Sequence, residues 1–166
     1  MNLFLKIILW ADALLLAATW WTGYARPPVL GTPDEFHMPL GLLACVVTLL
    51  VQAQFLSYLI TTGWDLRHHA EDQGKAPEAA VRARQIKGAC LPWIAMPALG
   101  AVAAGILGMA ARALVAPPWV HRAVTALTTC AAFGAAWILP AQAAELDELC
   151  EQLGLDEEAR GTLPNR

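Results

Sequence analysis

The sequence predicts an all-α integral membrane protein with four transmembrane helices in an up-down bundle. Of its 166 residues, 57% are hydrophobic and 15% are charged, whereas soluble globular domains usually carry about 25% charged residues. The charges are also segregated. None falls between Glu35 and Asp65, and only Arg112 and Arg122 fall within residues 88–144. Apolar runs of this length are typical of membrane spans.

We expect the spans at residues 3–24, 39–62, 91–114 and 119–143, within a transmembrane domain of residues 1–144. Each run can cross a hydrocarbon core about 30 Å thick as a helix. A barrel is disfavoured because the runs lack alternating polarity, and the backbone of a helix forms all its hydrogen bonds internally.

The first span also resembles a signal peptide, because the small residues of Gly23-Tyr24-Ala25 fit a cleavage site. We expect it to be retained, since the run is longer than a typical signal-peptide core and contains a carboxylate.

Outside the spans, we expect residues 63–90 to form a loop with a short helix, and residues 145–166 an acidic tail. Leu146, Leu149 and Leu153 fall on one face of a short amphipathic helix in this tail. Two interpretations fit equally: the tail helix packs against the ends of the bundle, or it docks a partner subunit.

Lysine and arginine residues predict the orientation. Loop 63–90 carries five, and Lys6 lies on the same side of an up-down bundle, whereas Arg26, Arg112 and Arg122 lie on the other side. We therefore expect the loop and both termini to be cytoplasmic, in a bacterial inner membrane (cytoplasmic or intracytoplasmic). We expect the seven tryptophans to be interfacial anchors.

Asp12 lies inside an apolar run, where a carboxylate costs about 2.5–3.5 kcal/mol on insertion scales. Counting 1.5 Å per residue places Gln52, Thr128 and Thr129 near the same depth. The sequence thus predicts an intramembrane polar layer in which Asp12 bonds to Gln52 or a threonine. The layer is a proton or ion relay, a polar contact to a bound cofactor, or an interhelical clasp with Asp12 protonated.

His37 and His121 precede or begin two helices that start on the same side of the membrane. Two histidines from different helices at one depth can hold a haem b iron, a metal ion or a quinone head group. The alternative is a pair of interfacial histidines that bond to lipid headgroups or loop carbonyls.

Other patterns are weaker. In the segment WDLRHHAEDQ, Asp65 and His69 are four residues apart, as are His68 and Asp72, but two such pairs make a poor metal signature and we predict no metal site. The four cysteines are scattered, without Cys-x-x-Cys spacing.

Small residues Gly100, Ala104 and Gly108 form a stripe on which another helix can pack closely. The partner helix lies either in this chain or in another protein.

No phosphate-binding loop, nucleophile elbow, zinc-protease motif or basic cluster is present, so we expect neither catalytic residues nor a nucleic-acid partner. The leading hypothesis is a non-catalytic accessory subunit of a larger, energy-converting membrane complex. It rests on the small size, the small-residue stripe and the acidic tail. One alternative is a haem- or quinone-interacting electron-transfer protein that uses His37 and His121. Another is an oligomeric ion or small-molecule transporter with the polar layer at Asp12.

Overall fold

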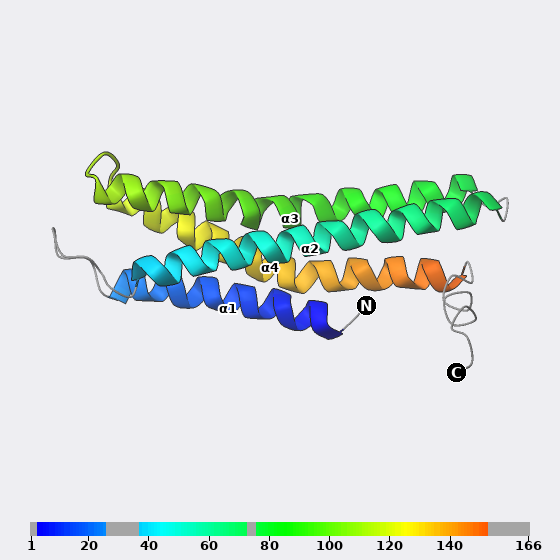
Figure 1. The fold of residues 1–166 in the computed structure, drawn as a ribbon, viewed down its shortest axis with the longest axis horizontal. Helices are drawn as coiled ribbons and strands as arrows, with labels where there is room; N and C mark the ends of the chain where they lie inside the picture. The colour runs from blue at the N-terminus through cyan, green and yellow to red at the C-terminus, as the bar shows by residue number, and fades with distance from the viewer. Residues whose placement is uncertain (1–2, 26–36, 73–75, 153–166) are drawn as a thin grey trace, which may run out of the picture.

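The computed structural model describes residues 3–25, 37–72 and 76–152. They form four α-helices: α1 (Leu3–Ala25), α2 (His37–Asp72), α3 (Ala76–Arg112) and α4 (Pro118–Gln152). Figure 1 shows the helices side by side, running alternately in opposite directions in one elongated bundle. Each helix is long and apolar enough to cross a membrane, which confirms the prediction of four apolar helices.

The helices pack in a ring in the order α1, α2, α3, α4, with α1 also against α4. The diagonal pairs, α1 with α3 and α2 with α4, are in much less contact than the neighbouring pairs. One end of the ring holds the last residue of α1, the first of α2, the last of α3 and the first of α4, and is called here the histidine end.

Small side chains fill the middle of the bundle, and large apolar side chains cover its outside. Ala13, Ala44 and Ala135 are buried, whereas Leu42 and Leu99 are exposed. In water such a surface would be a costly apolar patch. In lipid it is the expected arrangement, because helices there associate through close packing of small residues. The described helices are therefore well suited to contact with a lipid bilayer.

Helices α2, α3 and α4 continue well beyond the first residue of α1, at the end opposite the histidine end (Figure 1). Most of the expected loop 63–90 is consequently helical, and the short helix expected there is the first part of α3. The physical reason is that residues 76–87 are rich in helix formers, and Gly88 costs a helix only about 1 kcal/mol relative to alanine.

The extended ends of the three helices have their own contacts. Leu66, Ile86 and Leu146 are buried there in one apolar cluster. The Tyr58 hydroxyl donates a hydrogen bond to the Asp147 carboxylate, which links α2 to α4.

The first part of the expected acidic tail continues α4. Leu146 is buried, and Leu149 packs against the same apolar cluster, while Leu153 lies outside the described residues. Glu145 forms an ion pair with Arg82 of α3. The described part of the tail thus packs against the bundle, as the first of its two interpretations requires.

Helix α3 ends in a Schellman motif. The Val115 N–H donates to the Ala110 carbonyl at 2.9 Å, and the Leu114 N–H donates to the Ala111 carbonyl at 3.2 Å. This motif needs a left-handed residue, usually glycine, and Leu114 takes that place with φ of 59°. The reversal brings the start of α4, and with it His121, back to the end of α3.

Candidate functional site at the histidine end

The structure brings His37 and His121 together at the histidine end. Their ring centres are 6.2 Å apart and their planes cross at 76°. His37 is the first residue of α2, and His121 lies in the first turn of α4. Because these two helices are diagonal in the ring, the pair lies across the inside of the bundle.

Thr22 of α1 orients the His37 ring. Its Oγ1 lies 3.3 Å from Nδ1 of His37 and donates its own proton to the Thr19 carbonyl at 2.9 Å. If the Thr22 proton is directed to Thr19, the contact with His37 is made by an Nδ1–H donor, so the tautomer of His37 decides the direction of this hydrogen bond. Sequence reasoning missed Thr22, although its position near the end of the first span placed it at the depth of His37.

His121 is partly buried between α3 and α4. Its Nδ1 is buried and has no hydrogen-bond partner among the described residues. Its ring also lies near the backbone carbonyl of Ala104. A buried ring nitrogen without a partner is uncommon in folded proteins and points to a ligand or an ordered water.

Two glycines make room for the imidazoles. A Cβ on Gly23 of α1 would lie 2.5 Å from the His37 ring, and a Cβ on Gly108 of α3 would lie 3.1 Å from the His121 ring. Each ring therefore packs directly against the helix backbone at a glycine. Gly108 belongs to the predicted packing stripe, whereas the importance of Gly23 was not foreseen.

The remaining members of that stripe pack within the chain. A Cβ on Gly100 would overlap the Thr128 hydroxyl of α4. Ala104 is buried as well. The partner of the stripe is thus α4 of the same chain.

A second polar group lies deeper in the bundle, around Asp12. The Asp12 side chain is 1% exposed, and the Thr48 hydroxyl donates a 2.7 Å hydrogen bond to its Oδ1. Gln52, one helical turn beyond Thr48, lies beside the same carboxyl group. Neither amide atom of Gln52 reaches hydrogen-bonding geometry with any described residue.

Thr128 and Thr129 take no part in this group. Their hydroxyls donate to the carbonyls of Val124 and Thr125, four residues earlier on α4, at 2.8 and 2.9 Å. Threonine in a helix commonly satisfies its hydroxyl in this way. The polar layer thus divides into Asp12, Thr48 and Gln52 on α1 and α2, and two self-satisfied threonines on α4.

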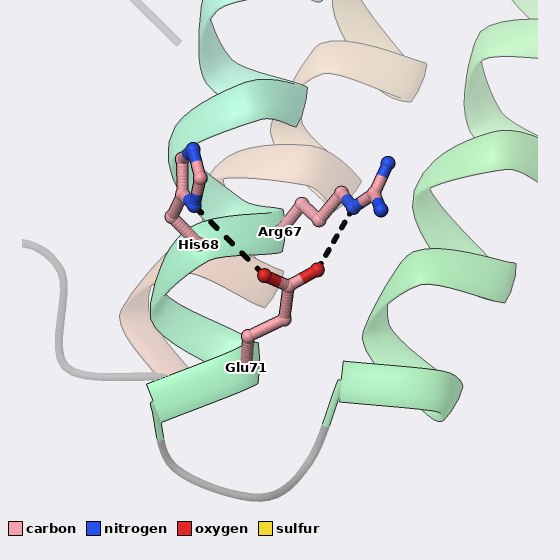
Figure 2. A network of polar contacts seen from close by, with 3 residues as sticks. All are labelled: Arg67, His68 and Glu71. Carbon is pink, nitrogen blue, oxygen red and sulfur yellow. Dashed lines mark hydrogen bonds and ion pairs between the residues drawn. The ribbon is translucent and has the colours of Figure 1, made fainter.

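His68, at the opposite end of α2, lies in a different environment. Figure 2 shows Glu71 between Arg67 and His68, with 2.9 Å to Arg67 Nε and 3.9 Å to His68 Nδ1. All three side chains are exposed, so these pairs contribute little to stability. The side chains of His69 and Asp72 lie outside the described ones.

Comparison of the chain with protein-family models, curated proteins and solved structures finds no match.

Proposed function

We propose that this chain is a small multi-pass membrane protein of electron transfer, in which His37 and His121 ligate a haem iron at the histidine end. The observation that carries the proposal is the approach of two imidazoles from different helices to 6.2 Å between ring centres. With metal–nitrogen bonds of about 2 Å, imidazoles on opposite sides of one metal have ring centres roughly 6 Å apart. Bound haem would supply reversible one-electron chemistry.

The hydrogen bonds around the pair favour a metal over a quinone. Thr22 Oγ1 lies 3.3 Å from His37 Nδ1 and can accept a hydrogen bond from Nδ1–H, as the second-shell partner of a metal-binding histidine does. The unpartnered Nδ1 of His121 offers a second nitrogen. Quinone binding would instead use imidazole N–H groups as donors to the quinone oxygens.

The small number of protein ligands favours haem over a bare metal ion. No group of three or more His, Cys, Asp or Glu side chains that could hold a metal occurs among the described residues. A structural metal ion usually takes four protein ligands. A haem brings four nitrogens of its own and needs only axial ligands from the protein.

The experiment is an absorption spectrum of the gently solubilised full chain, oxidised and then reduced with dithionite. The proposal predicts a reduced-minus-oxidised haem signal that co-elutes with the chain in a fixed ratio. A flat spectrum from protein produced with ample haem would contradict it.

A second candidate function is the accessory subunit of a larger membrane complex, and an exposed polar side chain on α2 favours it. Gln54 is exposed in the middle of an apolar helix, where lipid offers no hydrogen bonds. Ser57 is also exposed, but its hydroxyl donates to the Ala53 carbonyl of the same helix at 2.9 Å. The stripe and the described tail pack within the chain, so they no longer favour this candidate over the first. The candidates are also compatible, since a haem subunit can belong to a complex.

Gln54→Leu tests this candidate. If Gln54 bonds to a partner helix, the substitution should reduce co-purification of that partner by roughly three- to twentyfold, because interhelical hydrogen bonds in membranes contribute about 0.6–1.7 kcal/mol. The measurement is quantitative mass spectrometry of chains that co-purify after mild solubilisation. Leu50→Ala, on an exposed apolar position of the same helix, is the control. Unchanged partner recovery for Gln54→Leu would contradict a bonding role.

A further inference from the structure

We propose that Asp12, Thr48 and Gln52 form a site that binds one proton and one water molecule in the middle of the expected membrane region. The proton resides on the Asp12 carboxyl, and the water satisfies the Gln52 amide beside that carboxyl. This site is independent of the histidine pair. Thr48 lies eleven residues from His37 along α2, or about 16 Å.

Burial and the absence of a countercharge favour a neutral Asp12. The nearest charged residue on α1 is Lys6, six positions earlier in the chain. Helix α2 carries no charged residue before Asp65, and α4 carries none from residue 123 to residue 144. An unpaired carboxylate in apolar surroundings is so costly that the group takes up a proton instead.

The other titratable groups of α2 in this stretch are engaged elsewhere. Tyr58 donates to Asp147, and Cys45 donates to the Ala101 carbonyl of α3. Within the described helices, no ion pair joins Asp12 to a positively charged side chain.

The hydrogen bonds place the proton on one oxygen of Asp12. Oδ1 accepts from the Thr48 hydroxyl at 2.7 Å, which is a usual length for an O–H donor. The carboxyl proton is then carried by Oδ2, since Oδ1 is already an acceptor. Thr48 thus stabilises the carboxyl group without supplying a charge.

Gln52 supplies the evidence for the water molecule. Its side chain is 2% exposed, and both its amide nitrogen and its amide oxygen lack a hydrogen-bond partner among the described residues. Buried polar atoms of this kind are usually satisfied by ordered water. A water beside Gln52 and Asp12 can accept the carboxyl proton and donate to the amide oxygen, and so provides a route for proton exchange.

A metal cation fits this group less well. Sodium and calcium ions need several oxygen ligands, and Asp12, Thr48 and Gln52 offer few. The Thr48 hydroxyl also donates its proton to Asp12 Oδ1, so Thr48 Oγ1 and Asp12 Oδ1 bond to each other and do not both face an ion.

Infrared spectroscopy of the full chain in lipid tests the proposal. At neutral pH we expect the C=O band of a protonated carboxylic acid, which disappears in Asp12→Asn and shifts in heavy water as the proton exchanges. Gln52→Leu should keep the band but slow its exchange roughly tenfold, the factor that corresponds to about 1.4 kcal/mol. Gln54→Leu makes the same substitution on the exposed face of the same helix and should exchange at the unmodified rate.

Two results would overturn the proposal. The first is a neutral-pH spectrum without an acid band that depends on Asp12. The second is an exchange rate that Gln52→Leu leaves unchanged. If Asp12→Asn does not fold, selective ¹³C labelling of aspartate in the unmodified chain identifies the band instead, because exposed aspartates are ionised at neutral pH.

Discussion

Replacing either His37 or His121 with alanine should abolish the haem signal of the purified chain. If His37 and His121 hold a haem as proposed, the loss of either would leave it with a single protein ligand at a partly exposed end of the bundle. Thr22→Val should lower haem affinity by roughly 10- to 100-fold without removing it, as is typical when a metal ligand loses its second-shell partner. The measurement is the haem-to-protein ratio after purification and a titration of the apoprotein with haemin.

His68→Ala is the matched control for these variants. His68 lies on the same helix as His37 and is exposed at the other end of the molecule, where its ring meets that of Trp64 edge to face with 4.4 Å between the ring centres. It should retain the full haem content. All variants should keep the helical circular dichroism and elution volume of the unmodified chain, so that a lost signal reports the ligand and not the fold. Full haem content in either His37→Ala or His121→Ala would refute the paired-ligand proposal.

The sequence was sufficient to predict the four helices, because apolar runs longer than 20 residues leave few structural alternatives. It did not predict how far the helices continue. The apolar run ends where charged residues begin, but the helix continues past that point. Residues 76–90 are helical despite their charges. The packing that holds this part depends on long-range contacts such as Leu66 with Ile86 and Leu146.

The sequence predicted those features of the candidate site that depend only on the depth of a residue in the membrane. Counting residues from the span ends placed His37 and His121 at one level, and the structure brings them within 6.2 Å. Depth alone says nothing about which face of a helix a residue occupies. For that reason Thr128 and Thr129 were grouped with Asp12, although they bond to their own helix.

Thr48, the hydrogen-bond partner of Asp12, was not predicted, although the sequence contains a pattern that indicates its position. Thr48 precedes Gln52 by four residues, which places both on one face of α2. An inward-facing Gln52 therefore implied an inward-facing Thr48 one turn away. The depths of the polar residues along the membrane do not reveal this spacing.

The largest expected effect on stability comes from Gly100→Ala. A Cβ at this position would overlap the Thr128 hydroxyl, which is itself held by its hydrogen bond to the Val124 carbonyl. Either that hydrogen bond must break or α3 and α4 must move apart. Overpacking of this kind costs about 1–3 kcal/mol. We expect a corresponding loss in the free energy of unfolding, measured by denaturant titration in detergent micelles.

Gly88→Ala distinguishes this clash from the general effect of alanine in a helix. Gly88 lies on the same helix α3, and a Cβ there would meet nothing within 4 Å. Alanine should therefore stabilise the protein at this position, by about 0.5–1 kcal/mol.

Adding Thr128→Ala to Gly100→Ala should recover most of the loss, with a coupling energy of about 0.5–3 kcal/mol, because the two side chains would share one space. If Gly100→Ala were as stable as Gly88→Ala, the close contact of α3 with α4 that brings Gly108 against His121 would be wrong.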